Sequence, residues 1–213
     1  MSEPRLSTLG DSAVTFTLGE GISEDLNDLV VAEAAKISSA RLPGVLDVVS
    51  AYASVAVHYD PCRISYVDLV ERVRALKPAT VEPLSVQRAT HVIPVRYDGE
   101  DLNEVSETLR IDVSEVIAIH SSQEYRVFVI GFVPGFAYLG PLDERLVLPR
   151  RDAPRKRVPA GSVAIAEAQT GIYPSVTPGG WHLIGTTDVR MFDPGAEKPA
   201  LLSVGDRVRF VKS

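Results

Sequence analysis

The sequence predicts an α+β protein with two parts, a small N-terminal β-α-β-β-α unit and a C-terminal β-barrel. Strand and helix patterns alternate along the first part, and a segment with two prolines follows at 78–90. Glycine and proline then become dense, because 19 of the chain's 30 lie between Gly131 and Gly205. Helices tolerate that density badly, so we expect short strands and tight turns there. We place the two domains at 1–85 and 86–213.

The N-terminal unit is expected to begin with a strand at 13–18 and a capped helix. Ser23 is a suitable N-cap. Glu24 and Asp25 suit the first turn, because acidic groups are stabilised at the positive end of the helix dipole. Helical spacing places the apolar side chains on one face: Leu26, Leu29, Val30, Ala34 and Ile37.

A strand pair and a second helix complete this unit. A turn at Pro43-Gly44 precedes strands at 45–49 and 53–59. Ser65 predicts the cap of a second helix, which ends at Lys77-Pro78 because a proline disfavours helical backbone in the residue before it.

The C-terminal part reads as short strands with two short helices. The strands are expected at 91–97, 125–131, 162–168, 181–186 and 207–211. The helices are expected at 102–109 and 114–120, the second ending at His120, where a cation would suit the helix dipole. Many short strands with few helices favour a closed barrel.

Composition excludes several classes of function. The formal net charge is −6 and the isoelectric point is near 5.3, which argues against nucleic acid as a partner. The single cysteine, Cys62, permits no internal disulfide and no Cys/His metal cluster, so we expect no metal. No signal peptide is visible, and no apolar run approaches the ~20 residues that cross a bilayer. We expect a cytoplasmic protein without a membrane partner.

The segment GFVPGFAYLG (131–140) is a candidate pocket rim. Glycine permits positive φ and close approach of a ligand, while proline stiffens the loop. The candidate rim residues are Phe132, Pro134, Gly135 and Tyr138. Alternatively, the loop closes one end of the barrel, and we expect Phe132 and Phe136 to be core residues because aromatic side chains are usually buried.

The segment PRRDAPRKRVPAGSVAIA (149–166) carries a cluster of cations held extended by prolines. A planar guanidinium matches a carboxylate in a bidentate manner, so Arg150 and Arg155 are candidate ligands for an anionic substrate. The alternative is a solvated surface strip or a set of salt bridges. Ser162 lacks a base close in sequence, so it is interpreted as a structural or substrate-binding hydroxyl.

The segment QTGIYPSVTPGGWHLIGTT (169–187) carries the remaining candidates. Gly179 and Gly180 allow a sharp turn whose N–H groups can receive an oxyanion. Tyr173 and Trp181 are candidate substrate contacts, although Trp181 also suits a core position. His182 is the one acid/base candidate, although its place in the strand after Trp181 favours a structural role. No complete catalytic constellation is visible.

These three segments, together with LLSVGDRVRF (201–210), resemble the KipI family over nearly the whole chain. The family is also known as the PxpB-type 5-oxoprolinase subunits, as allophanate hydrolase subunit 1, or as carboxyltransferase subdomains C and D. The resemblance implies a small N-terminal α/β domain and a cyclophilin-like C-terminal β-barrel.

The resemblance also implies a function that depends on other subunits. The expected role is that of a non-autonomous subunit of an ATP-dependent 5-oxoprolinase, which converts 5-oxoproline to glutamate. Its partners would be a KipA-like larger subunit (PxpC, allophanate hydrolase subunit 2) and a LamB/YcsF-like subunit (PxpA). The alternatives are a KipI-like inhibitor of a histidine kinase and a subunit acting on allophanate or urea derivatives.

Two residues depart from the family pattern. Thr186 stands where arginine is frequent, and Glu167 stands where a small residue is common, so the exact substrate is left open. The sequence has no Walker A phosphate loop. We therefore expect the complex to use ATP without this chain binding the nucleotide alone.

Overall fold

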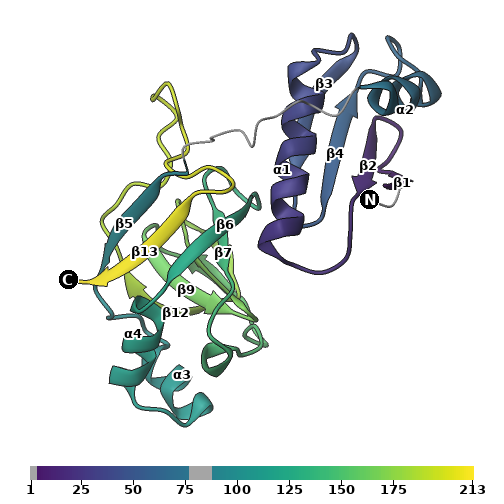
Figure 1. The fold of residues 1–213 in the computed structure, drawn as a ribbon. Coiled ribbons are helices and arrows are strands. Elements are labelled where there is room, and N and C mark those ends of the chain that lie inside the picture. The colour runs from purple at the N-terminus through teal and green to yellow at the C-terminus, as the bar shows by residue number, and fades with distance from the viewer. Residues whose placement is uncertain (1–3, 77–87) are drawn as a thin grey trace. The chain divides into compact units, whose positions relative to one another are not determined.

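The computed structural model describes residues 4–76 and 88–213 of the 213-residue chain (Figure 1). The chain divides into two compact units, residues 1–87 and 88–213. The sequence-based boundary between 85 and 86 and the expected helix end at Lys77-Pro78 lie outside the described residues. Both units combine helices with sheets, which confirms the α+β fold class.

The N-terminal unit is a four-stranded antiparallel sheet with two helices. Its strand order is β1-β2-β4-β3. The strands are β1 (Arg5–Thr8), β2 (Ala13–Thr17), β3 (Val45–Ser50) and β4 (Ser54–Tyr59), and the helices are α1 (Glu24–Ser39) and α2 (Tyr66–Ala75). The expected β-α-β-β-α succession is therefore present, preceded by the additional strand β1. A buried cluster that includes Phe16, Val30, Val57 and Leu69 holds the helices on the sheet.

Both predicted helix caps are confirmed. The Ser23 hydroxyl accepts a hydrogen bond from the Leu26 amide at 3.2 Å, and the Ser65 hydroxyl accepts one from the Asp68 amide at 3.1 Å. The expected packing of Leu29 is wrong, because this side chain is 42% exposed.

The C-terminal unit is built around a seven-stranded, nearly closed sheet of order β12-β9-β10-β7-β6-β13-β5. An isolated bridge between Arg96 and Thr186 connects its two ends. The strands are β5 (Thr90–Val95), β6 (Glu124–Ile130), β7 (Ala137–Gly140), β9 (Ser162–Ala166), β10 (Gln169–Ile172), β12 (His182–Thr186) and β13 (Arg207–Lys212). A separate pair joins β8 (Arg155–Val158) to β11 (Thr177–Gly179). The expected barrel is confirmed as a barrel-like sheet.

Three short helices accompany this sheet: α3 (Leu102–Leu109), α4 (Val113–Ser121) and the 3₁₀ turn η1 (Glu144–Leu146). In Figure 1, α3 and α4 lie together at one end of the barrel. Aliphatic and aromatic side chains from the strands and helices fill the interior, Val127, Leu139, Ile165 and Phe210 among them. No helix in the described ranges is long and apolar enough to span a bilayer.

A buried polar chain crosses this interior at His120. The Thr170 hydroxyl donates to the Ala164 carbonyl at 3.0 Å, so it accepts from His120 Nε2 at 2.9 Å. The other ring nitrogen, Nδ1, then accepts from the Tyr97 hydroxyl at 2.8 Å. Both nitrogens of a neutral imidazole are thereby satisfied. Burial lowers the pKa of His120 to about 3. His120 is therefore a buried structural histidine, and its neutral ring places no cation at this helix end.

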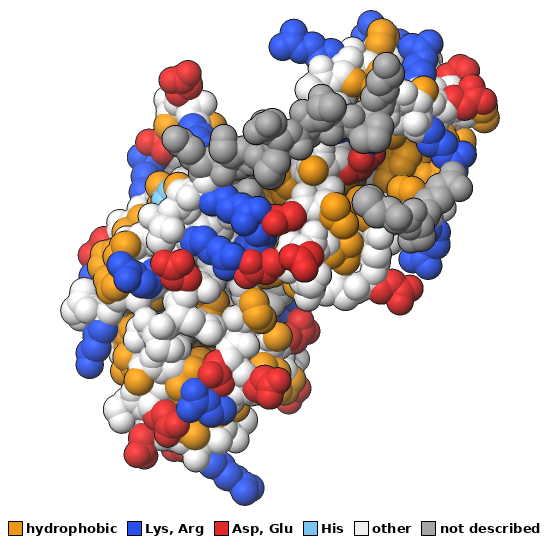
Figure 2. Space-filling model, viewed as in Figure 1, with side chains coloured by type: hydrophobic (Ala, Val, Ile, Leu, Met, Phe, Trp, Pro, Cys, Tyr) orange, Lys and Arg blue, Asp and Glu red, His pale blue; other side chains and the backbone are white. Residues whose placement is uncertain are grey.

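Charged side chains of both signs are scattered over the face shown in Figure 2, among hydrophobic and uncharged atoms. Figure 2 shows Lys and Arg groups neighboured by Asp and Glu groups there, without a long stripe of basic side chains.

Candidate functional site

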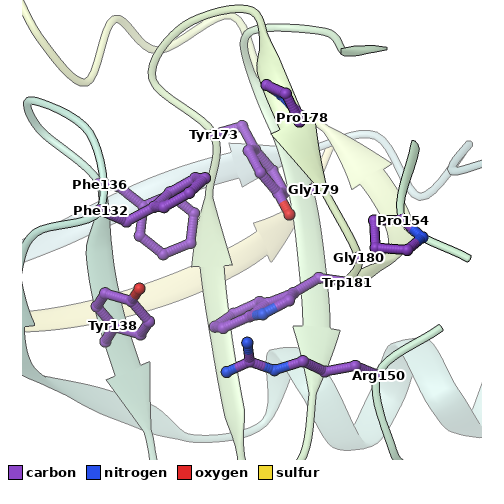
Figure 3. A pocket seen from close by; sticks show the side chains of 10 residues that line it. All are labelled: Phe132, Phe136, Tyr138, Arg150, Pro154, Tyr173, Pro178, Gly179, Gly180 and Trp181. Carbon is purple, nitrogen blue, oxygen red and sulfur yellow. The ribbon is translucent and has the colours of Figure 1, made fainter. Parts of the chain in front are cut away.

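A pocket of about 230 Å³ opens on the C-terminal unit (Figure 3). It is lined by Phe132, Phe136, Tyr138, Arg150, Pro154, Tyr173, Pro178, Gly179, Gly180 and Trp181. These residues come from all three motif segments that the sequence singles out. Most of the lining is aromatic or proline, and one side chain of the lining, that of Arg150, carries a charge.

Phe136 is the centre of the aromatic lining. Its ring is buried and meets four other rings edge to face, at centroid separations of 5.0 to 5.6 Å. The four partners are Phe132, Tyr138, Tyr173 and Trp181. Such contacts add about 0.5–1.5 kcal/mol each beyond area burial. The lining is therefore a packed wall whose members hold one another in place.

Phe132 forms the exposed edge of this wall. Its side chain is 61% exposed and its backbone has a φ of 68°, in the left-handed region. Few side chains adopt that conformation without support. The loop supplies support, because the Gly131 amide donates to the Phe136 carbonyl at 3.0 Å. The expectation that Phe132 is a core residue is wrong, whereas Phe136 is buried as expected.

The Gly179-Gly180 turn needs glycine at its first position. A Cβ on Gly179 would overlap the Tyr173 hydroxyl, whereas one on Gly180 would lie 3.6 Å from Pro154, an ordinary contact. The Gly180 carbonyl accepts from the Arg151 amide at 2.9 Å. The turn is thus fitted to the tyrosine behind it, and its expected role in receiving an oxyanion stays a prediction.

Arg150 is presented by a segment that is anchored on both sides. The Pro149 carbonyl accepts a hydrogen bond from His182 Nε2 at 2.9 Å. On the other side, the Arg151 amide is bound to Gly180. Figure 3 shows the Arg150 side chain extending toward the part of the pocket that carries Trp181 and Tyr138. The backbone contacts therefore fix the position from which the Arg150 side chain extends, although the side chain itself is 55% exposed.

The two tyrosines of the pocket remain neutral. Burial raises the pKa of Tyr138, against the opposing charge of Arg150. Burial also raises the pKa of Tyr173, against a backbone hydrogen bond from Trp181. Both hydroxyls therefore keep their protons at neutral pH and can donate a hydrogen bond to an oxygen of a ligand.

Arg155 lies outside the lining, in an ion cluster. Its Nη2 donates to Asp101 Oδ1 and its Nε pairs with Glu100, each at 2.6 Å. Arg151 Nη1 also donates to Asp101, at 2.7 Å. Asp101 is buried and accepts from the Leu183 amide at 2.7 Å. Sequence patterns did not point to this aspartate, whose one visible signal was its place directly before the helix expected at 102–109.

The other candidates also lie outside the lining. Ser162 is buried at the start of β9, and its carbonyl accepts from the Tyr173 amide at 2.9 Å. Gly135 has a φ of 82° and packs on Phe192, which a Cβ would approach to 2.6 Å. Pro134 belongs to the same loop but not to the lining. His182 is held by the Pro149 carbonyl, so it contributes to the placement of Arg150.

Metal ligands are not grouped in the described part of the chain. Among residues 4–76 and 88–213, no three His, Cys, Asp or Glu side chains lie so that they could hold an ion. The site is therefore described by its aromatic wall, two neutral phenols and one guanidinium. That combination suits a small ring compound carrying a negative charge.

Comparisons with known proteins agree with the resemblance seen in the sequence. Residues 4–202 match the family model described as carboxyltransferase domain, subdomain C and D. A protein from Bacillus subtilis strain 168, named as the B subunit of 5-oxoprolinase, is 41% identical over 221 aligned residues. The alignment covers 98% of this chain and 92% of that protein.

Solved structures share the fold. The crystal structure of the protein TTHA0988 has a TM-score of 0.84 and 43% identity, covering 94% of this chain. This chain spans only 40% of the length of that protein. The Kluyveromyces lactis urea carboxylase is 18% identical with a TM-score of 0.74, covering 98% of this chain and 21% of that one, so the likeness extends to the fold alone.

Proposed function

This chain belongs to the family described as carboxyltransferase domain, subdomain C and D, and we propose that it is a non-autonomous subunit of an ATP-dependent 5-oxoprolinase. In this proposal the pocket beside Arg150 binds 5-oxoproline. The name of the Bacillus subtilis relative supports the assignment to a 5-oxoprolinase complex. We also propose that the complex works in the cytoplasm.

The single cation within an aromatic pocket carries the proposal. 5-Oxoproline is a five-membered lactam with one carboxylate. Its carboxylate would pair with the Arg150 guanidinium, and its ring would lie against the wall that includes Trp181. Tyr138 is part-exposed, so its neutral hydroxyl can donate to the lactam oxygen.

The proposed chemistry assigns activation to ATP and positioning to this chain. A lactam is unreactive, so the γ-phosphoryl group of ATP would pass to the lactam oxygen and make it a leaving group. ADP would leave at that step, one water would add at the ring carbon, and the C–N bond would break with the proton of that water passing to the nitrogen, giving the acyl phosphate of glutamate. A second water would then hydrolyse the acyl phosphate to glutamate and phosphate. Arg150 and the aromatic wall would hold the ring in place through these steps.

We propose that ATP is bound with the help of the other subunits. The pocket of about 230 Å³ is below the roughly 300–1,000 Å³ usual for drug-sized ligands. It therefore suits a small ring better than a nucleotide. The proposed partners are the KipA-like and LamB/YcsF-like subunits, which would complete the catalytic site.

Reconstitution tests this function. Purified partner subunits are mixed with 5-oxoproline and ATP, with and without this chain, and glutamate is measured. Glutamate release that requires the chain is the expected result. Equal release without it, from an assembled complex, would contradict the proposal, and inhibition of a histidine kinase or action on allophanate would then be examined in its place.

A further inference from the structure

The cation of the pocket has a counter-charge within the chain. Arg150 Nε lies 3.3 Å from Glu167 Oε1. Both side chains are more than half exposed, at 55% and 58%. Glu167 itself lies outside the lining of the pocket. The guanidinium that faces the pocket is therefore partly neutralised from outside it.

Backbone contacts build this pair. Glu167 bridges Leu148, with its amide donating to the Leu148 carbonyl at 2.6 Å, and Leu148 is two residues before Arg150. Glu167 also has a φ of 53°, in the left-handed region. A non-glycine residue persists in that region only where its surroundings hold it. The carboxylate is thus placed beside Arg150 by the same bridge that ties down the segment carrying this arginine.

We propose that Glu167 is a specificity-determining residue that neutralises Arg150 in the free chain and gives way to the carboxylate of the ligand. The inference rests on the proposed function, because it takes Arg150 as the carboxylate site. An exposed ion pair is weak and screened by water, so a carboxylate arriving from the pocket side can replace it. A neutral ring has nothing to exchange with Glu167 and gains nothing from Arg150.

A different role for Glu167 would have the opposite sign. If the Glu167 carboxylate accepted a hydrogen bond from the lactam N–H of the substrate, removing the carboxylate would weaken binding. Its position outside the lining favours competition for Arg150 over contact with the ring. The direction of the change in affinity therefore separates the two roles.

The experiment measures ligand binding to the whole chain and its Glu167→Gln variant. Glutamine keeps the length of the side chain and the strained backbone while removing the charge. Trp181 is the one tryptophan in the sequence and lines the pocket, so its fluorescence reports binding. The ligands are 5-oxoproline and 2-pyrrolidinone, the same lactam ring without its carboxylate. Glu197→Gln, at an exposed position, is the matched control.

We expect Glu167→Gln to bind 5-oxoproline about 1.5- to 5-fold more tightly, which is the range of an exposed ion pair. Affinity for 2-pyrrolidinone should not change, and Glu197→Gln should resemble the parent chain. In an Arg150→Gln background the effect of Glu167→Gln should disappear.

The possible failures are distinguishable. If the parent chain binds 5-oxoproline and Glu167→Gln binds it equally or less tightly, the inference is overturned and the proposed function stands. An effect that persists in the Arg150→Gln background also overturns the inference. If neither chain binds 5-oxoproline, the assignment of the pocket fails, and the inference fails with it.

Discussion

Replacement of Arg150 by glutamine removes the one charge of the pocket lining. A hydrogen bond between charged groups contributes about 1.5–3 kcal/mol. The contribution is smaller here for two reasons. The Arg150 side chain is 55% exposed, and ligand binding breaks its ion pair with Glu167, whose loss offsets about 0.2–1 kcal/mol of the binding free energy. A net loss of about 1–2 kcal/mol follows. The variant should therefore raise the KM for 5-oxoproline about 5- to 30-fold.

The assay is steady-state glutamate release by the assembled complex, with 5-oxoproline varied at saturating ATP. The KM for ATP should not change, because this chain is proposed to position the lactam. Arg157→Gln removes a nearby exposed cation outside the lining and is the matched control. A KM for 5-oxoproline within about twofold of the parent value, in a variant that unfolds at the parent temperature, would refute the assignment of Arg150.

Three further predictions concern the turn, the buried histidine and the anchor of Arg150. Gly179→Ala should weaken 5-oxoproline binding at least about tenfold, because its Cβ would displace Tyr173, whereas Gly180→Ala should bind normally; equal affinities would contradict the fitted turn. The pKa of His120 is about 3 in the folded chain and about 6.5 in the unfolded chain. Between these two pH values the ring therefore binds a proton in the unfolded chain but not in the folded chain. The free energy of unfolding is therefore highest above about pH 6.5. Below that pH it should fall by about 1.4 kcal/mol per pH unit relative to the His120→Gln variant, as measured by urea unfolding. Parallel pH profiles of the two chains would exclude a neutral buried ring. Replacement of His182 by leucine should raise the KM for 5-oxoproline several-fold, and glutamine, which can still donate to the carbonyl, should restore most of it; equal KM values would contradict a positioning role.

The N-terminal helices were predictable because their signals are local. Ser23 and Ser65 cap the helices that follow them, as their spacing from the first apolar residues indicates. The prediction for Leu29 failed because periodicity does not show which edge of an apolar stripe the sheet covers. Asn27 of the same helix is buried, and its side-chain amide donates to the Ala51 carbonyl at 3.3 Å. This contact joins residues 24 positions apart.

Several strands of the C-terminal unit could not be found from periodicity. Strands β7, β8, β10 and β11 contain three or four residues each. So short a run gives one or two alternations, too few to separate a strand from a loop. Their positions depend on pairing between strands, of β7 with β6 and β10, of β10 with β9, and of β8 with β11, and the sequence shows only the high content of glycine and proline around them. The cyclophilin-like character of the barrel stays a prediction.

The pocket was partly predictable from aromatic residues that lie within glycine- and proline-rich segments. Phe132, Tyr138, Tyr173 and Trp181 stand in glycine- and proline-rich segments, and the fold brings them together with Arg150. Local sequence could not show which of the two candidate arginines, Arg150 or Arg155, lines the pocket.

The difference between the arginines comes from distant partners. Arg155 pairs with Asp101, which lies 54 positions earlier in the chain. Arg150 meets Glu167 through a bridge at Leu148. Both arrangements depend on tertiary contacts, which is also why Asp101 was missed.

The most direct test of the proposed substrate site is a crystal structure of the assembled complex with 5-oxoproline. We expect the ligand carboxylate within hydrogen-bond distance of the Arg150 guanidinium, with the lactam ring against Trp181. Ligand bound at another place in the complex, with this pocket empty, would contradict it.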